Sequence, residues 1–505
     1  MNPFYKILFI LVGITLALGC THTKDSYRKP TVTGKLSDVL RYGQNETPAI
    51  KFTVPNLLIG EETEYQTAIN QDGTFAIYIP LVSPVYAKIS VGLDHYGGWI
   101  LLVPGETLHL DDFGKSGLEN IKGVVLTSEN LKDIQNVAEK MIKVLESGEN
   151  LPKANFPITP ETFVESGLVR MNKDLAIIYE DSVLSESHKK LYCDWVKPFY
   201  LNNFFDYEGV FIRSYNIQKK LKNEDIVDSV PQKLDKTYFS FLRDFDLNHP
   251  PQMNDGYYSK NLQAILTQPV LNIPKIGDNL IGDWQKEAKA ILSDITGIES
   301  GLFYDMLAAE AYIVQLRNDL TPLSNKQKSN IKNYFTNPSF TDILFSENGN
   351  MLSRLKQIKE NTRKNLVVNE TPVVEKEKLM DAIVSKYKGK VVLVDFWATW
   401  CQPCMYAIKE SHSLKEKFKD KKVAFVYITD ISSSKELWKK TIQEIGYEHY
   451  FLNKEEMESI AFSKQYGFNG IPAYLLFDAT GVLKEKLTGY PGNNKMQTMI
   501  EKLLP

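Results

Sequence analysis

The pattern of hydrophobic and polar positions changes twice along the chain. From residue 31 to residue 125, apolar residues alternate with polar ones in short runs, as in strands with one buried face. From 126 to 365, they recur about every 3.6 residues, as in amphipathic helices. From 366 to 505, continuous apolar runs alternate with helical stretches. The pattern therefore predicts three folded regions: a β region, an α-helical region and an α/β domain.

Six short runs in the first region predict strands. They are Ala49–Val54, Tyr65–Asn70, Thr74–Pro80, Val85–Val91, Trp99–Leu102 and Thr107–Leu110. Residues 71–73, Gln-Asp-Gly, indicate a hairpin turn between two of them. The regular spacing favours a small antiparallel β-sandwich. His95 and His109 have no partner at metal-ligand spacing, so we interpret them as surface or packing residues.

The helical region is rich in aromatic residues. Leu131–Leu145 carries apolar side chains on one helical face, and five more stretches continue this periodicity. They are Lys173–Leu184, Ser187–Tyr200, Tyr238–Phe245, Asp283–Ile295 and Gly301–Leu316. We interpret the aromatic residues as core, with an exposed groove for a partner or peptide as the alternative. Cys193 has no nearby second cysteine and is interpreted as a buried free thiol.

Residues 361–376 are polar and predict a linker into the last domain. A helix is expected over Glu377–Tyr387, followed by strands and helices in the order β-α-β-α-β-β-α. The expected strands are the apolar run from Val391, Val423–Thr429, Ala473–Phe477 and Val482–Leu487. The expected helices follow Cys401, lie between Ser433 and Gly446, and cover Lys495–Leu504. The last two strands form a predicted hairpin.

Composition and charge narrow the possible functions. The chain has 505 residues, of which 43% are hydrophobic, enough for several buried cores. Its net charge of −3 offers no basic face for phosphate backbones, so no nucleic-acid partner is expected. It contains four cysteines, which do not form a disulfide framework.

The N-terminus carries targeting signals. Met1–Gly19 has a basic residue followed by an apolar run too short to span a membrane, the pattern of a signal peptide. Its end, Ala-Leu-Gly-Cys, resembles a bacterial lipobox, so we expect Cys20 to be acylated and residues 20–30 to form a tether. An uncleaved anchor or an ordinary signal peptide is the alternative. The expected location is the cell envelope, lipid-anchored and facing the periplasm or cell surface, where disulfides persist.

Two cysteines separated by two residues follow the buried strand. Cys401 and Cys404 fall where a helix begins, and a helix N-terminus stabilises a thiolate. The thiolate is the form that attacks disulfides. Cys401, first in the helix and more exposed, is the predicted nucleophile, and Cys404 is the predicted resolving thiol. The alternative is a permanent disulfide or half a zinc site, although no second Cys-X-X-Cys supplies the other ligands.

An acidic residue, Asp395, lies in this apolar strand six residues before Cys401. Burial of a lone carboxylate raises its pKa. Asp395 is therefore predicted to take a proton from the resolving thiol and to return it later. An aspartate at a strand end without a catalytic role is the alternative.

The string Trp-Ala-Thr-Trp-Cys-Gln-Pro-Cys, residues 397–404, resembles the active site of the thioredoxin superfamily. Residues 389–404 are most similar to its membrane-tethered TlpA/ResA-like branch. The resemblance covers roughly the last quarter of the chain and implies a thioredoxin fold for residues 366–505. It also implies a thiol–disulfide oxidoreductase without a bound cofactor. The β region resembles the N-terminal β-domain often found ahead of such secreted bacterial modules.

The resemblance implies roles for three further residues. Trp400 would cover the site, with core packing as the alternative. Pro472 would be the cis-proline that faces the cysteines, with a trans turn proline as the alternative. The cis bond would leave the backbone of Ile471 free to pair with an extended substrate. One departure is that the branch commonly has Glu and Pro where this chain has Ala407 and Lys409.

The residues favour an enzyme that exchanges disulfides with disulfide-bonded protein substrates. The dipeptide at residues 402–403, Gln-Pro, lacks the histidine of strongly oxidising relatives, which favours a reductase with a membrane electron donor as partner. A thiol peroxidase is one alternative, although Ala398 stands where peroxiredoxins have threonine. A surface or periplasmic binding protein is another, in which residues 31–365 capture a partner or glycan and the redox domain is accessory.

Overall fold

The computed structural model describes residues 26–36, 49–91, 95–113, 124–126, 158–182, 184–218, 231–252, 256–361, 366–460, 466–468 and 470–504. The predicted signal peptide, Cys20 and the predicted helix Leu131–Leu145 lie outside these residues. The chain divides into two compact units. One contains residues 1–56, 61–132 and 331–342, and the other contains the remainder. No helix in the described ranges combines the length and apolarity needed to cross a membrane.

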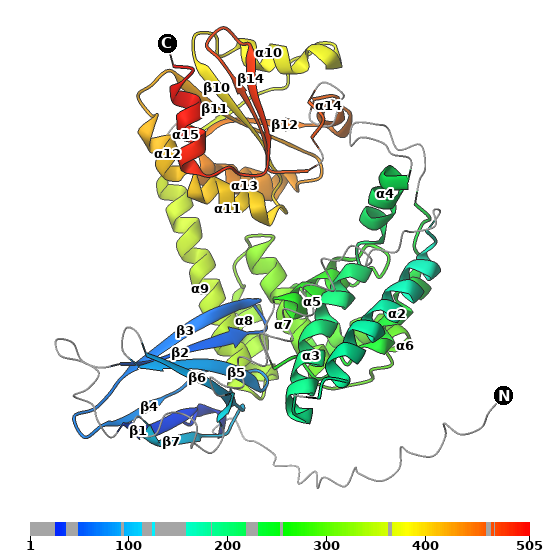
Figure 1. The fold of residues 1–505 in the computed structure, drawn as a ribbon, viewed down its shortest axis with the longest axis vertical. Coiled ribbons are helices and arrows are strands. Elements are labelled where there is room, and N and C mark those ends of the chain that lie inside the picture. The colour runs from blue at the N-terminus through cyan, green and yellow to red at the C-terminus, as the bar shows by residue number, and fades with distance from the viewer. Residues whose placement is uncertain are drawn as a thin grey trace. The chain divides into compact units, whose positions relative to one another are not determined.

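The N-terminal region forms two sheets (Figure 1). The five-stranded sheet has the order β3-β2-β5-β6-β8, and all its pairs are antiparallel. The three-stranded sheet has the order β4-β1-β7. The strands are β1 Val32–Leu36, β2 Ala49–Asn56, β3 Glu61–Ala68, β4 Thr74–Ile77, β5 Val85–Val91, β6 His95–Leu102, β7 Leu108–Phe113 and β8 Val124–Leu126.

This arrangement confirms a sheet-rich N-terminal region but corrects one predicted detail. The pair β1–β7 is parallel, so the sheets are not antiparallel throughout. The two strands lie far apart in the sequence, and a long connection allows the chain to return in the same direction. Residues 71–73 do form a turn, with Gly73 at φ +83°, but β3 pairs with β2 and β4 with β1. The turn is closed by hydrogen bonds from the N–H of Gly73 to the carbonyl oxygen of Asn70 and from the N–H of Asn70 to that of Thr74, as the hairpin prediction expects. It also joins the two sheets, and packing of the sheets as a sandwich stays a prediction.

The described part of residues 158–361 is helical, as its periodicity predicts. The helices are α2 Pro160–Tyr179, α3 Glu186–Phe204, α4 Tyr207–Gln218, the 3₁₀ helix Lys236–Asp244, α5 Tyr257–Thr267, α6 Ile281–Thr296, α7 Leu302–Arg317, α8 Asn325–Tyr334 and α9 Pro338–Asn361. Tyr200, Phe204 and Tyr207 are buried, and the rings of Phe204 and Phe241 lie 5.1 Å apart, which confirms the interpretation as core for these residues. Cys193 is a buried free thiol, as predicted.

The C-terminal region is built on one six-stranded sheet with the order β14-β13-β10-β11-β12-β9. Strands β9 to β12 are mutually parallel, β13 runs antiparallel to β10, and β14 runs antiparallel to β13. The strands are β9 Leu366–Val368, β10 Val391–Phe396, β11 Val423–Asp430, β12 Tyr447–Leu452, β13 Ala473–Phe477 and β14 Leu483–Thr488. The helices are α10 Leu379–Ser385, α11 Gln402–Glu410, α12 His412–Lys417, α13 Lys435–Ile445, α14 Lys454–Ile460 and α15 Asn493–Glu501. The predicted β13–β14 hairpin is confirmed.

The prediction that residues 361–376 form a linker is wrong in one respect, because these residues contain strand β9. This strand has three residues and is mostly exposed, so it carries none of the alternation that identifies longer strands. It forms by pairing with β12. Strand β12 was also not predicted from the sequence. Residue 447, the first of β12, has a positive φ of 71°, which places an irregular backbone directly at the strand's start.

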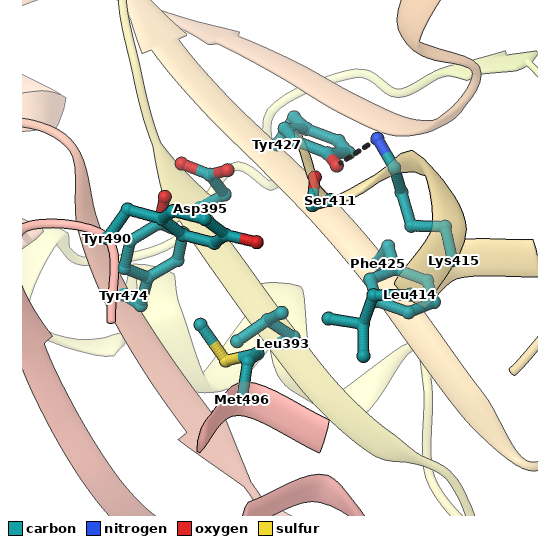
Figure 2. Close-up of a pocket in the computed structure, with 10 residues that line it drawn as sticks. All are labelled: Leu393, Asp395, Ser411, Leu414, Lys415, Phe425, Tyr427, Tyr474, Tyr490 and Met496. Carbon is teal, nitrogen blue, oxygen red and sulfur yellow. Dashed lines mark hydrogen bonds between the residues drawn. The ribbon is translucent and has the colours of Figure 1, made fainter. Parts of the chain in front are cut away.

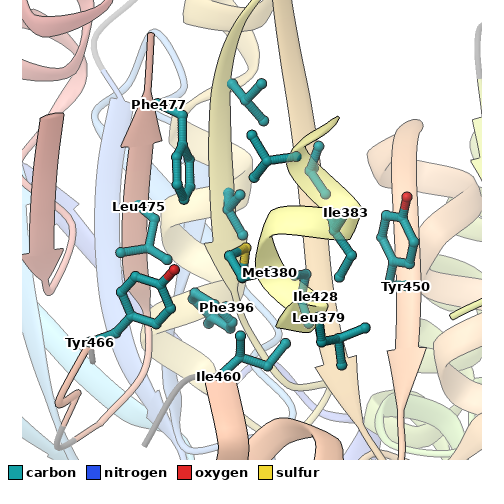
Figure 3. Close-up of a cluster of buried hydrophobic side chains, with 14 of the residues drawn as sticks. Leu379, Met380, Ile383, Phe396, Ile428, Tyr450, Ile460, Tyr466, Leu475 and Phe477 are labelled. Carbon is teal, nitrogen blue, oxygen red and sulfur yellow. The ribbon is translucent and has the colours of Figure 1, made fainter. Parts of the chain in front are cut away.

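The central strand β10 separates two apolar clusters. All six of its residues are buried. Val392, Val394 and Phe396 contribute to the cluster in Figure 3, with residues from α10 and β13. Val391 and Leu393 contribute to the opposite cluster, which also holds Cys401 and Cys404. Because side chains alternate along a strand, Asp395 lies on the face of the cysteines.

Candidate active site

The two cysteines meet where β10 gives way to a helix. Cys401 is the N-cap of α11, and Pro403 lies in the first turn, where its missing N–H costs no hydrogen bond. A disulfide joins Cys401 to Cys404, with the Cα atoms 5.2 Å apart. The backbone N–H of Cys404 donates to Sγ of Cys401 over 3.2 Å. After reduction, the same N–H and the helix N-terminus would stabilise a thiolate on Cys401.

Both sulfur-bearing residues are buried. Cys401 is 4% exposed and Cys404 is 1% exposed. Cys401 is slightly more exposed than Cys404, as expected if Cys401 is the attacking thiol and Cys404 the resolving thiol. Ala407, which stands where the TlpA/ResA-like branch commonly has a glutamate, is buried on the same helix and supplies no acid.

The loop before β13 faces the disulfide. The peptide bond between Ile471 and Pro472 is cis. The carbonyl oxygen of Ile471 lies 3.8 Å from Sγ of Cys401. Ile471 also packs against the apolar cluster that contains both cysteines. The structure therefore brings Ile471, Pro472 and Cys401 together at one end of the sheet.

Trp400 lies at the rim of this site and does not pack in the core. It is 60% exposed, and its Nε1–H donates to Oγ of Ser432 over 3.2 Å. The neighbouring N–H of Thr399 donates to Oγ of Ser433 over 3.0 Å. These two contacts join the segment before Cys401 to the loop that follows β11.

Replacing Trp400 by alanine should slow the reaction with a folded protein disulfide several-fold, because a partner protein loses this contact area. The free energy of unfolding should change by less than about 0.5 kcal/mol, since the side chain is exposed. Reduction rates with a folded protein disulfide and with oxidised glutathione check this, because glutathione is too small to need the indole. Tyr406→Ala removes another exposed aromatic of the same region and is the matched control. Equal slowing with both substrates would contradict the contact role.

Asp395 lies in the middle of the sheet, beside β11 and β13. Its residue partners in the ladders are Tyr427 and Tyr474. The side chain is buried, and its Oδ1 has no hydrogen-bond partner. Burial therefore raises the pKa of this carboxyl well above its usual value, and the nearby Lys415 ammonium opposes the shift. The shift favours the protonated, uncharged form of this carboxyl.

Asp395 lines a small cavity together with residues from α12, β11, β13 and the segment after β14 (Figure 2). The cavity measures about 10 Å³, close to the least volume that holds one water molecule. Its other lining residues are Leu393, Ser411, Leu414, Lys415, Phe425, Tyr427, Tyr474, Tyr490 and Met496. The acid thus has a confined space beside it, with a lining that is mostly apolar.

Lys415 is a site residue that the sequence did not predict. It is 2% exposed, although lysine is almost never fully buried. A signal was available, because residues 404, 408, 411 and 415 follow the spacing of one helical face. The helix changes to α12 at Ser411, which breaks the periodicity and hides that signal.

Within the described ranges, no three His, Cys, Asp or Glu side chains gather where they could hold a metal ion. Cys20, the predicted lipidation site, lies outside the described residues.

Residues 389–483 match the family model described as thioredoxin-like. The C-terminal domain is thioredoxin-like. The matched segment contains Asp395, both active-site cysteines and Pro472, and it covers less than half of the chain.

The thioredoxin-like domain is similar to named bacterial proteins. It is 25% identical over 118 residues to "Thiol-disulfide oxidoreductase ResA" of Bacillus thuringiensis (23% of this chain, 66% of the relative). It is 26% identical over 127 residues to "Thioredoxin-like protein YneN" of Bacillus subtilis (25% of this chain, 70% of the relative). The chain thus spans about two thirds of the length of the curated relatives that it matches.

Two solved structures are also similar to the thioredoxin-like domain. One is a thiol:disulfide interchange protein of Chlorobium tepidum, with 23% identity and a TM-score of 0.22, covering 24% of this chain and 84% of that one. The other is the thioredoxin domain of a thiol-disulfide oxidoreductase of Bacteroides vulgatus, with 27% identity and a TM-score of 0.21 over the same shares.

Proposed function

We propose that the protein is a thiol–disulfide oxidoreductase of the cell envelope that reduces disulfides of extracytoplasmic proteins. The observation that carries the proposal is the Cys401–Cys404 disulfide at the N-terminus of α11, beside the Ile471 carbonyl. The relatives named as thiol-disulfide oxidoreductases support it. The dithiol itself holds two electrons, so the reaction needs no bound cofactor.

The reaction begins with the reduced dithiol. The Cys401 thiolate attacks one sulfur of a substrate disulfide, a mixed disulfide forms, and the first substrate thiolate leaves. Cys404 then gives its proton to the Asp395 carboxylate and attacks Sγ of Cys401. The intramolecular disulfide forms as the bond from Cys401 to the substrate breaks, and the second substrate thiolate leaves. Two electrons pass from the protein to the substrate.

The setting of this reaction follows from the N-terminal sequence. Acylation at Cys20 would anchor the protein to a membrane and leave residues 31–505 facing the periplasm or the cell surface. In an oxidising compartment, a reductase is left with its dithiol oxidised to a disulfide after one turnover unless electrons are supplied. A membrane electron donor that reduces Cys401–Cys404 is therefore part of the proposal.

The reduction potential of the Cys401/Cys404 pair tests the direction of electron flow. Equilibration of the full-length protein with glutathione redox buffers should give a value near that of thioredoxin, about −270 mV. With dithiothreitol present to regenerate the dithiol, the protein should also reduce a protein disulfide over many turnovers. A potential near that of the oxidant DsbA, about −120 mV, would reverse the direction, and absence of any turnover would overturn the proposed function.

A further inference from the structure

We propose that the C-terminal domain carries a second binding surface, which takes the anionic headgroups of a phospholipid membrane. This lysine surface consists of Lys388, Lys390, Lys421 and Lys422, all of them exposed, together with the exposed turn residue Val482. It lies at the end of the sheet opposite the disulfide. The inference therefore goes beyond the proposed redox reaction and can be tested without it.

The lysines meet at the amino ends of β10 and β11. These two strands are parallel, and the N–H of Val391 donates to the carbonyl oxygen of Lys422 over 2.9 Å. Lys390 and Lys422 each directly precede one of these neighbouring strands. Lys388 and Lys421 lie within two residues of them in the sequence. The pairing of the strands thus gathers four lysines from two separate segments.

The turn between β13 and β14, residues 478–482, reaches the same end of the sheet. The N–H of Gly389 donates to the carbonyl oxygen of Ala479 over 2.9 Å. Val482 is 52% exposed, and its N–H donates to the Asp478 carboxylate over 3.0 Å, which fixes the turn. Leu483, the next residue, is 36% exposed. Exposed apolar side chains beside lysines suit the boundary between lipid headgroups and acyl chains.

The lysines are available to a ligand. Lys388, Lys390 and Lys422 form no ion pair with any residue that the structure describes. Lys421 has its Nζ 5.6 Å from the ring centroid of Phe418, a contact that leaves its charge uncompensated. Phosphate groups of a membrane can therefore pair with all four.

The acids near the lysine surface do not cancel its charge. Asp478 pairs with Lys484 over 3.0 Å, and Glu416 lies 4.0 Å from Lys419. Asp420, directly before the second lysine pair, contributes one negative charge against four lysines. The surface thus keeps an excess of positive charge, although the whole chain has a net charge of −3.

Two observations favour a membrane over an acidic protein as the ligand. An acidic protein surface would match the lysines, but a headgroup layer also accepts the exposed Val482 beside them. The expected acylation of Cys20 tethers the chain to a lipid surface, which raises the local concentration of that surface. Each lysine near anionic lipids strengthens binding about fivefold.

Binding through the lysine surface sets the direction in which the disulfide faces. Strands β10 and β11 run from the lysines toward the end of the sheet at which Cys401 begins α11. The disulfide therefore faces away from the lipid and toward soluble substrates. An electron donor must reach it from that side.

The test uses the predicted mature chain, residues 20–505, with Cys20→Ser so that no acyl chain contributes to binding. Cosedimentation measures its affinity for vesicles of equal parts phosphatidylglycerol and phosphatidylcholine, and for vesicles of phosphatidylcholine alone. This parent chain should bind the anionic vesicles at least about tenfold more tightly. Added salt should weaken the binding, because it screens the charges. Equal affinity for the two kinds of vesicle would overturn the proposal.

Lys390→Gln/Lys422→Gln removes two charges of the surface and should weaken binding to the anionic vesicles by about tenfold or more. Lys435→Gln/Lys439→Gln is the matched control, because it removes two exposed lysines from α13. This control should bind as the parent does. Val482→Ser should weaken binding several-fold through loss of its apolar side chain. Unchanged affinity of folded Lys390→Gln/Lys422→Gln would overturn the proposal.

Two further measurements separate this proposal from its alternatives. Lysine-dependent binding to polyglutamate without binding to anionic vesicles would overturn it and indicate an acidic protein partner. Lys390→Gln/Lys422→Gln should reduce a protein disulfide in solution at the parent's rate, because these lysines lie far from Cys401. If the parent binds anionic vesicles but reduces no disulfide, the proposed function is wrong and the membrane contact stands.

Discussion

A Cys404→Ser variant should accumulate mixed disulfides with its substrates, each linked through Cys401. The variant retains the nucleophile at the N-cap of α11 but lacks the thiol that releases the substrate. Multiple turnover should fall by about three orders of magnitude or more, since residues that act as a unit lose nearly all catalysis when one is removed. Non-reducing electrophoresis and mass spectrometry of captured adducts measure the trapping and identify the substrates.

Cys401→Ser is the matched control, and it should trap little, because Cys404 is the more buried of the two sulfur-bearing residues. Cys193 remains in both variants. Burial raises the pKa of its thiol, so it should stay protonated and unreactive. A Cys401→Ser/Cys404→Ser double variant tests whether Cys193 contributes any adduct.

One outcome would favour a different function for the chain. If Cys404→Ser captures no substrate in cells while the full-length protein still binds a partner tightly, the alternative of a binding protein with an accessory redox domain gains support. Capture of specific envelope proteins would instead support the proposed oxidoreductase and reveal its substrate class.

Asp395→Asn should raise the free energy of unfolding at pH 7 by about 1 kcal/mol or more, because a buried carboxylate is costly without full compensation. The attraction of Lys415 is lost in the variant, but burial is the larger effect on this carboxyl. The folded-state pKa of Asp395 lies above the unfolded value of about 3.9, so the natural protein loses stability as the pH rises above that value. The advantage of the variant should therefore be small near pH 4 and grow toward neutral pH.

The same substitution should slow the second half-reaction. Without a carboxylate, Cys404 must lose its proton to solvent, so release of substrate from the mixed disulfide should slow while its formation does not. Denaturant unfolding of the oxidised protein at several pH values measures the stability, and single-turnover kinetics separates the two steps. Asp430→Asn, at the end of the neighbouring strand, is the control acid. Equal stability of Asp395→Asn and the natural protein at all pH values would contradict the expectation.

The features predicted well from sequence are those whose cause is local. The six consecutive buried residues of β10 follow from an unbroken apolar run, and the helix after Cys401 follows from its own cap and periodicity. Strand β5, Val85–Val91, has the predicted bounds because its alternation extends over its whole length. The cysteine pair lies at a helix N-terminus because of the strand and helix that flank it.

The features that were missed depend on distant partners. The parallel pairing of β1 with β7 and the formation of β9 are decided by which strand edge is available, which no local pattern encodes. Lys415 was missed because the helix changes to α12 after Ser411 and the helical periodicity breaks there. Its hydroxyl partner, Tyr427, lies on strand β11, which the local pattern around Lys415 does not encode.

Strand β9 also determines which backbone groups are exposed at one edge of the C-terminal sheet. Its three residues engage the backbone amide and carbonyl groups along Tyr447–His449 of β12. An open edge of this kind is a template on which another polypeptide could add a strand and begin aggregation. Here the preceding segment of the same chain occupies much of that edge, and the strand that becomes outermost is too short to serve as a good template. The fold thereby limits strand addition at the β9 side of the sheet.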